Sequence, residues 1–466
     1  MVIAVRESRY HMAQISVNFK RSMGKMKPMH ATNNGPSVSP RDGGDVTADW
    51  RIGANMAEFR AAGIPYARNH DASFFARYGL EHTVDVVAIF PDFDADVNDP
   101  ASYDFTCTDN YLQAIEAAGT KTFYRLGHRI EHEVKKYGTL PPKDFQKWAE
   151  ICEHIIRHYT EGWADGFHMD IEYWEIWNEP DLDPDDARNK RTWGGTKAEF
   201  FELYHIAATH LKSCFPHLKI GGPALASKLD WAEEFLAQLK APLDFFSWHI
   251  YACRVEKMVA KVQAVRTLLD KYGFTETESI LNEWNYVRGW HGEEMIYSNI
   301  QRKELKGAAF VAAAMCDCQR TPLDMLMYYD ARPSGWCGMF DFAQLGKCTL
   351  KPYFPFYMFN VFYGLGTEVE SISDDGDVHV CAAAGEGEAA LMLNYYNDDD
   401  TADEKQVSVE LVGFGGDAGT EAEVYLLDDE HDLTLAYKLI FFGERFVWET
   451  TVPKHTCYLV KLKKRV

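Results

Sequence analysis

With 466 residues, of which 46% are hydrophobic and 25% are charged, the chain is long enough for two globular domains and is not intrinsically disordered. Asp and Glu together number 70 and Lys and Arg 48, which gives a formal net charge of −22. This charge repels phosphate backbones and anionic membrane surfaces, so we expect neither nucleic acid nor a membrane as a partner.

The N-terminal residues favour a cytoplasmic protein. The apolar run that opens the chain is only five residues long before Arg6, too short for a signal-peptide core or a membrane span. Ten cysteines are scattered, and the one close pair, Cys316 and Cys318, lacks the second pair that a zinc site needs. We therefore expect reduced thiols and no metal or other cofactor. The alternating segment 13–21 predicts that residues 1–24 join a β-domain rather than a barrel.

From about residue 26 to 330, short apolar runs alternate with helical stretches, which predicts repeated β-α units. Eight runs follow one another, namely MKPMHATNNG, GIPYARNHD, KTFYRLG, DIEYWEIWNEP, KIGGPALA, DFFSWHIY, SILNEWNY and DMLMYYDARP. Apolar residues at helical spacing lie at 144–159, 197–214, 231–239, 255–272 and 308–319. Eight parallel strands with intervening helices close into a barrel, so we predict an α/β fold with a (β/α)₈ TIM barrel over residues 25–354.

After Phe354 the pattern changes to alternating apolar and polar residues between Gly and Asp turns, without long helical stretches. Residues 355–466 are therefore predicted to form a smaller, antiparallel β-sandwich-like domain. The acidic run 398–400 is interpreted as a solvated turn. The glycine-rich segment 413–416 is also interpreted as a turn, because no Lys-Ser/Thr follows it as in a phosphate-binding loop.

Two predicted strands end in an Asn-Glu pair, Asn178-Glu179 in the fourth run and Asn282-Glu283 in the seventh. A carboxylate after an apolar strand costs desolvation energy unless it is paired, so each Glu alone could be a salt-bridged structural residue. Strands four and seven face each other across a closed barrel, which favours one shared pocket. Such a pair suits glycosidic cleavage, with retention of configuration when the carboxyl groups lie about 5 to 5.5 Å apart.

In such a pair, the acid must stay protonated near neutral pH. A neighbouring negative charge and a partly apolar wall raise the pKa of a carboxyl group. Trp177, Trp284 and Tyr286 are expected to build that wall.

The segment WEIWNEPDL, with NEWN further along the chain, resembles glycoside hydrolase family 39. The resemblance continues through RNHD at 68–71, FPDF at 90–93, RLG at 125–127 and SWHIY at 247–251, and so covers essentially the whole barrel. That family contains β-xylosidases and α-L-iduronidases and belongs to a clan of retaining barrel hydrolases. WNEP alone is shared by many clan members, and the early His-Asp pair makes the match more specific.

The resemblance implies that Glu179 is the acid/base and Glu283 the nucleophile. It makes Asn178 the partner of the sugar 2-hydroxyl, whose hydrogen bond strengthens in the transition state. His70 and Asp71 would hold other hydroxyls of the terminal sugar.

The resemblance also implies that His249 and Tyr251 border the nucleophile and that Trp336 is an aromatic platform for the sugar face. His70 and His249, taken singly, are more often strand-end histidines bonded to backbone than ligands, and Trp336 could equally be loop packing. Arg68 is interpreted as the structural partner of a buried carboxylate such as Glu283.

One competing motif, HRIEH at 128–132, matches the H-x-x-E-H signature of inverted zinc metalloproteases. Only three positions are fixed, and no flanking feature supplies a third ligand. Because the motif directly follows the third strand, its side chains are expected to line the loop above it.

We therefore expect a retaining exo-glycosidase that removes terminal sugars, with β-D-xylose as the leading expectation, from short oligosaccharides. An α-L-iduronidase-like specificity stays open because Arg254, Arg288 and Arg332 lie in loops that could reach a sugar carboxylate, and β-galactosidase-like or α-L-arabinopyranosidase-like action also stays open. A non-catalytic carbohydrate-binding barrel is the alternative of a different class, against which the presence of both glutamates argues. Apart from the substrate, the expected partner is at most a second copy of the chain.

Overall fold

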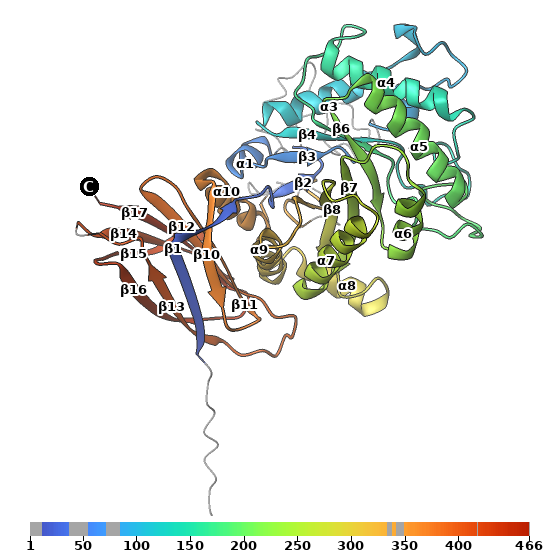
Figure 1. The fold of residues 1–466 in the computed structure, drawn as a ribbon. Coiled ribbons are helices and arrows are strands. Elements are labelled where there is room, and N and C mark those ends of the chain that lie inside the picture. Colours follow the sequence, from blue (N-terminus) through green and yellow to red (C-terminus); the bar gives the residue numbers. More distant parts are fainter. Residues whose placement is uncertain are drawn as a thin grey trace, which may run out of the picture.

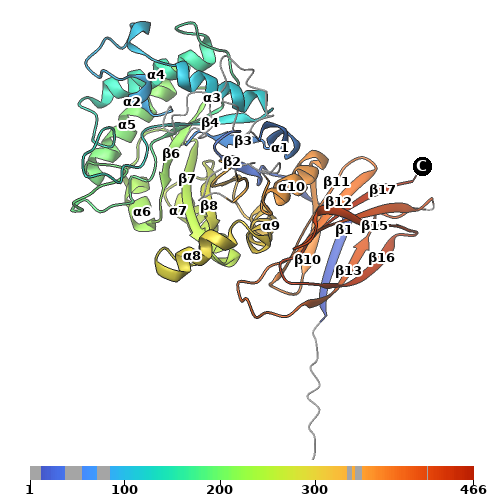
Figure 2. The same cartoon turned by 180° about the vertical axis from the view of Figure 1, so that it is seen from behind.

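The computed structural model describes residues 12–36, 55–70, 84–332, 338–341, 349–416 and 418–465. Figures 1 and 2 show a barrel wrapped by helices and, beside it, a domain made mainly of β-strands, here called the sheet domain. Among these residues, the structure contains no helix that is both long and apolar enough to span a membrane.

The barrel is a closed ring of eight parallel strands that follow one another in sequence order. Its strands are β2 (Ala31–Asn33), β3 (Tyr66–Arg68), β4 (Lys121–Leu126), β5 (Tyr173–Ile176), β6 (Lys219–Leu225), β7 (Phe245–Ala252), β8 (Glu278–Tyr286) and β9 (Met325–Tyr328). Each strand lies within one predicted run or extends at most one residue beyond it, so the predicted (β/α)₈ barrel is confirmed. Side chains such as Phe123, Phe245 and Met327 fill its interior.

Helices cover the outside of the barrel. They are α1 (Met56–Ala61), α2 (Val86–Ile89), the 3-10 turn Pro100–Ser102, α3 (Thr106–Ala117), α4 (Phe145–Glu161), α5 (Lys197–Cys214), α6 (Leu229–Gln238), α7 (Val255–Lys271), α8 (Gly292–Gln301) and α9 (Leu305–Gln319). Helix α4 shows why they form. Asp144 caps its first turn, apolar residues at helical spacing are buried against the barrel, and Gly162 ends it in the left-handed conformation.

The sheet domain is one nine-stranded sheet in the order β15-β14-β17-β12-β11-β10-β1-β13-β16. Its strands are β1 (Ala13–Lys25), β10 (Thr367–Ser373), β11 (Val378–Ala384), β12 (Glu388–Tyr395), β13 (Lys405–Val412), β14 (Thr420–Leu427), β15 (Asp432–Phe441), β16 (Arg445–Val452) and β17 (Cys457–Lys464). The pairing of β1 with β13 is parallel, and the other pairings in this sheet are antiparallel. Figure 1 shows β1, from the start of the chain, among strands from its end.

The central strands β11 and β12 are buried on both faces of the sheet. Val380 and Leu391 point into the domain's own core, whereas Cys381 and Met392 belong to the apolar cluster that continues into the barrel. The helix α10 (Tyr353–Leu365) packs on this second face. The expectation of no long helix after residue 354 was wrong, because α10 is apolar almost all round and shows no helical period that the sequence could reveal.

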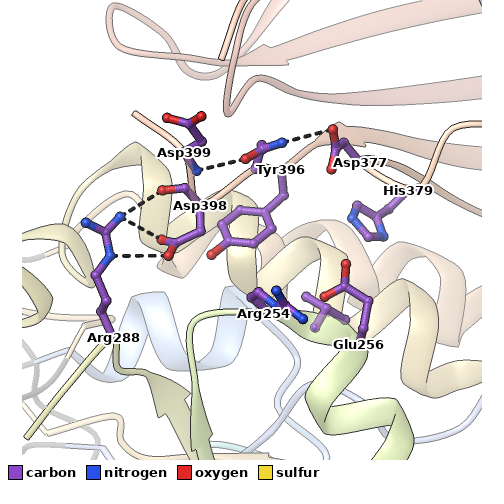
Figure 3. A pocket seen from close by; sticks show the side chains of 11 residues that line it. Arg254, Glu256, Arg288, Asp377, His379, Tyr396, Asp398 and Asp399 are labelled. Atoms are coloured by element: carbon purple, nitrogen blue, oxygen red, sulfur yellow. Dashed lines mark hydrogen bonds and ion pairs between the residues drawn. The ribbon is translucent and has the colours of Figure 1, made fainter. Parts of the chain in front are cut away.

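The acidic run 398–400, predicted to be a solvated turn, instead joins the two domains. Asp398 accepts hydrogen bonds from the Tyr286 hydroxyl at 2.7 Å and from Arg288 at 3.0 Å, as Figure 3 shows for the arginine. The ammonium of Lys306, whose side chain is 1% exposed, lies 3.0 Å from Asp398 and 2.9 Å from Asp400. The prediction failed because all three barrel partners lie far away in sequence.

Replacing Asp398 by Ala should lower the free energy of unfolding by about 2 to 3 kcal/mol. The change leaves the buried Lys306 with one fewer counter-charge, and the loss falls near the lower end for buried pairs because Asp398 is 20% exposed. Chemical denaturation measures this loss. The neighbouring variant Asp399→Ala is the control, with an expected loss below about 1 kcal/mol because the exposed Asp399 carboxylate accepts its hydrogen bonds from Thr401, within the same turn. Equal losses of unfolding free energy in the two variants would contradict the role of Asp398 in joining the two domains.

Candidate active site

Glu179 and Glu283 lie together at the carboxyl end of the barrel strands. Glu179 follows β5 and Glu283 lies within β8, and a carboxylate oxygen of each lies within 4.8 Å of the other. Their side chains are 14% and 10% exposed. His249 on β7 lies beside both, with its Nδ1 2.8 Å from Glu179 and 3.6 Å from Glu283. The structure thus brings two carboxyl groups from opposite sides of the barrel into one buried site.

The backbone at Glu179 is unusual. Trp177 and Glu179 adopt positive φ angles of 73° and 49°, a left-handed conformation that costs a non-glycine residue roughly 1 to 3 kcal/mol. Two contacts hold it, since the Glu179 N–H donates to the Ala224 carbonyl at 2.9 Å and the Thr192 hydroxyl donates to the Glu179 carbonyl at 2.6 Å. This fixed turn at the end of β5 orients the Glu179 side chain towards His249.

The groups around Glu283 favour its ionised form. The Tyr251 hydroxyl donates to Glu283 Oε1 at 2.5 Å, and Arg68 Nη1 lies 3.6 Å from Oε2. His70 Nε2 lies 4.0 Å from the same oxygen. Tyr251 and His249 reach the site from one side of β7 because they are two residues apart on a strand.

Arg68 is the centre of a buried polar network beneath the carboxyl groups. Its Nε donates to Glu175 at 2.7 Å, its Nη1 to Asn33 at 3.0 Å and its Nη2 to Asn178 Oδ1 at 2.7 Å. The Asn282 amide donates to Glu175 at 2.5 Å. The main partner of Arg68 is therefore Glu175, and Glu283 is a more distant neighbour. Glu175 was missed, although a carboxylate within a buried strand always needs a partner.

Burial raises the pKa of both catalytic candidates, of Glu179 to about 8 and of Glu283 to about 7. The negative charge of Asp181 raises the pKa of Glu179 further, while Arg68 and the Tyr251 hydrogen bond oppose the rise at Glu283. Glu283 therefore ionises first, and Glu179 keeps its proton. Burial lowers the pKa of His249 to about 4, so this imidazole is neutral.

Asp181 is a second residue that the sequence analysis missed. It is 1% exposed and accepts hydrogen bonds from three successive backbone N–H groups, those of residues 226–228, at 2.7 to 3.0 Å. These bonds hold a negative charge near Glu179. The Asp directly after NEP in the sequence was the available signal.

Of the other residues predicted to bind the sugar, the structure describes Asn178 and His70. Asn178 is 3% exposed, and His70 packs edge-on against Tyr329, with ring centres 5.5 Å apart. Asp71 and Trp336 lie outside the described residues.

The predicted aromatic wall is wrong. Trp177 donates its indole N–H to the Thr192 carbonyl and packs against Trp193, and Trp284 packs against Phe310 of α9. Tyr286 bonds to the sheet domain. On β8, Trp284 and Tyr286 alternate with Glu283, so they face the helices when the glutamate faces the cleft.

The three arginines considered for a sugar carboxylate lie apart from one another. Arg288 is bound to Asp398, and Arg332 is paired with Asp330 at 2.6 Å. Arg254 lines an open cavity of about 580 Å³ between the barrel and the sheet domain, together with Tyr396 (Figure 3). This cavity shares no lining residue with the carboxyl pair.

The HRIEH motif forms part of a loop and not a metal-binding helix. The Glu131 carboxylate accepts hydrogen bonds from the backbone N–H groups of Tyr137 and Thr139 and from the Thr139 hydroxyl at 2.7 Å. His128 lies between Glu131 and Asp85, and His132 is exposed. The motif therefore braces the loop that follows β4.

Comparison with known proteins gives consistent results. A model described as Glycosyl hydrolases family 39 matches residues 13–431. A β-xylosidase from Geobacillus stearothermophilus is 25% identical over 347 residues, which cover 66% of this chain and 65% of that enzyme. A solved glucosidase from Croceicoccus marinus has a TM-score of 0.78 at 21% identity, covering 98% of this chain and 99% of that chain. A monomeric β-xylosidase from Caulobacter crescentus has a TM-score of 0.71 at 18% identity, covering 97% and 100%.

Proposed function

Because this chain belongs to glycosyl hydrolase family 39, we propose that it is a glycosidase that cleaves its substrate with retention of anomeric configuration. One observation carries the proposal of retention. The two carboxylate oxygens lie within 4.8 Å of each other, close to the separation of about 5 to 5.5 Å typical of retaining enzymes. Inverting enzymes need about 6.5 to 9.5 Å to admit a water molecule between the carboxyl group and the sugar.

The reaction then has two displacements. In the first, a carboxylate oxygen of Glu283 attacks the anomeric carbon while the carboxylic acid of Glu179 gives its proton to the departing oxygen. The leaving alcohol departs and a glycosyl ester of Glu283 remains. In the second, the Glu179 carboxylate takes a proton from water, the water oxygen attacks the anomeric carbon, and Glu283 is released as a carboxylate.

The surrounding groups support this division of roles. Glu283 has the lower pKa and contacts Tyr251 and Arg68, which favour the anion that attacks. Glu179 has the higher pKa and lies near the fixed charge of Asp181, which favours the protonated acid. Two carboxyl groups in different environments thus take opposite protonation states at the same pH.

Asn178 is positioned to donate a hydrogen bond to the sugar 2-hydroxyl. Arg68 occupies its Oδ1 at 2.7 Å, which leaves the Nδ2 hydrogens as the donors that face the substrate. His70 is the proposed ligand of a neighbouring hydroxyl. On the family resemblance we also propose Asp71 as a hydroxyl ligand and Trp336 as the platform for the sugar face.

The proposed substrate is a terminal β-D-xylosyl unit of a short oligosaccharide. The relative from Geobacillus stearothermophilus is a β-xylosidase, whereas one of the solved relatives is a glucosidase. The decisive comparison is therefore the activity on a pentoside against the activity on a hexoside. Specificity of the α-L-iduronidase type is the second candidate, and Arg332, which follows β9 and is paired with Asp330, is the cation that would have to bind the sugar carboxylate.

A panel of nitrophenyl glycosides tests the proposal. We expect the β-D-xyloside to have the highest kcat/KM, and we expect proton NMR to show a first-formed sugar with the anomeric configuration of the substrate. An inverted product would refute the double displacement. If no glycoside were cleaved but sugars bound and raised the unfolding temperature, the protein would be a carbohydrate-binding barrel.

A further inference from the structure

We propose that Glu153, His210 and Cys214 form a binding site for a divalent transition-metal ion of the zinc class. The site lies in the helical layer of the barrel and is separate from the carboxyl pair at its mouth. It does not depend on the proposed glycosidase function.

The backbone places the three side chains in one cluster. His210 and Cys214 lie one turn apart on α5, so both project from the same face of that helix. Helix α4 packs against α5, as Figure 1 shows, and supplies Glu153. The His210 Nε2 lies 2.7 Å from Glu153 Oε2 and 3.9 Å from Cys214 Sγ, and the three atoms all lie within 4.8 Å of one another.

These separations fit one ion after small movements. Zinc in a tetrahedral site binds nitrogen at about 2.0 Å and sulfur at about 2.3 Å, which places these two ligands about 3.6 Å apart. The same geometry places a nitrogen and an oxygen ligand about 3.4 Å apart. The Glu153 oxygen must therefore move back by less than about 1 Å, and the thiol must move in by a few tenths of an ångström. Side-chain rotation supplies both movements.

The chemistry of the cluster matches zinc and similar metals. Thiolate, imidazole and carboxylate are the protein ligands that zinc binds, and a fourth position remains for water. The side chains of His210 and Glu153 are 19% and 15% exposed, so solvent and an ion can reach them. On binding, the Cys214 thiol releases its proton to solvent, and His210 binds through Nε2 as a neutral imidazole that carries its proton on Nδ1.

The positive charge of Arg157 is the main obstacle to a cation here. Arg157 bonds to the other oxygen of Glu153 at 2.8 Å and to Glu161 at 2.5 Å, so a second carboxylate balances it. Glu150 adds a further negative charge and accepts a hydrogen bond from Gln146, whose amide also contacts His210 Nδ1. The local charge therefore favours an added cation.

A simple ion pair between His210 and Glu153 is the alternative interpretation. It accounts for the 2.7 Å contact, but it gives no role to the thiol that lies beside both ligand atoms. Bound metal would tie α4 to α5 and stabilise the fold. It would take no part in turnover.

Titration of the full chain with Co²⁺, followed by competition with Zn²⁺, tests the proposal. We expect one ion per chain, a sulfur-to-cobalt charge-transfer band, and a rise in the unfolding temperature on adding Zn²⁺. Cys214→Ser, a nearly isosteric change, should abolish the band and weaken binding more than about tenfold. Glu153→Gln should also weaken binding while keeping the thiol.

Two controls make the result decisive. Cys107→Ser removes another partly exposed thiol, on α3, and should leave the band and the affinity unchanged. Glu283→Gln tests the other three-ligand cluster, formed by Glu179, His249 and Glu283, and should also leave them unchanged. Unaltered binding in Cys214→Ser, or loss of binding in Glu283→Gln instead, would overturn the proposal. A chelator should lower the unfolding temperature of the metal-loaded protein without changing kcat.

Discussion

Replacing Glu283 by Gln should reduce kcat by at least about a thousandfold while the fold stays intact. An amide cannot form the glycosyl ester, and loss of a nucleophile removes a whole reaction step rather than one stabilising contact. The substitution removes a buried charge whose pKa burial has already raised, so the unfolding temperature should not fall. Steady-state kinetics on the preferred nitrophenyl glycoside, with a thermal unfolding curve, measures both effects.

Glu368→Gln is the matched control for this variant. Glu368 is another buried glutamate, 4% exposed, and it bonds to Gln319 away from the carboxyl pair. Its amide variant should keep kcat within about twofold of the wild type, since surface and scaffold changes far from the chemistry leave the transition-state contacts in place. Comparable turnover in the Glu283 and Glu368 variants would remove Glu283 from the mechanism.

Replacing Glu179 by Ala should reduce kcat/KM by about 10²- to 10⁴-fold for substrates with a poor leaving group. Activated aryl glycosides should keep nearly all of their kcat/KM, because their leaving groups depart without a proton. Their kcat should still fall, since the second displacement needs the Glu179 carboxylate as a base. A series of aryl glycosides of increasing leaving-group pKa measures this dependence, and equal losses along the series would refute the acid assignment.

The pH dependence of the same pair gives a second readout. Activity needs Glu283 ionised and Glu179 protonated, so kcat/KM should rise through about pH 7 and fall through about pH 8. The two carboxyl groups interact, so the two apparent pKa values of the pH profile describe the pair and not each residue alone. In Glu179→Ala the upper limb should vanish for activated substrates, and the lower limb should stay near pH 7, because Glu179 is still uncharged when Glu283 ionises. A retained upper limb would assign it to another group.

Much of the barrel could be predicted because its signals are local. Strands that are buried on both sides consist of short apolar runs, and these runs turn polar at the end where they reach the barrel mouth. Glu179 and Glu283 were recognisable for the same reason, since each lies in the polar part of such a run. The helix α10 had no comparable signal, because it is apolar almost all round and so lacks a polar face that would reveal a helical period.

Partner identity was beyond the sequence wherever the partner is distant in the chain. Arg68 was predicted to bind a buried carboxylate, and closing the barrel decided that the carboxylate is Glu175. The acidic run 398–400 has the composition of an exposed turn, yet Lys306 and Arg288 come to it from the barrel. Both cases concern charged groups. The sequence shows that a buried charge needs a partner, but it does not show which distant residue is that partner.

The sequence by itself determined the eight-stranded barrel, the alternating second domain and the two glutamates that follow apolar residues of their runs, because period and polarity are properties of neighbouring residues. Only the tertiary structure decided the direction of each side chain and the different surroundings of the two carboxyl groups. Barrel closure places His249, Tyr251, Arg68 and Asp181 around them, and burial in that shared space raises both pKa values. Desolvation and charge proximity act between residues far apart in the chain, so they arise only once the ring of strands has closed.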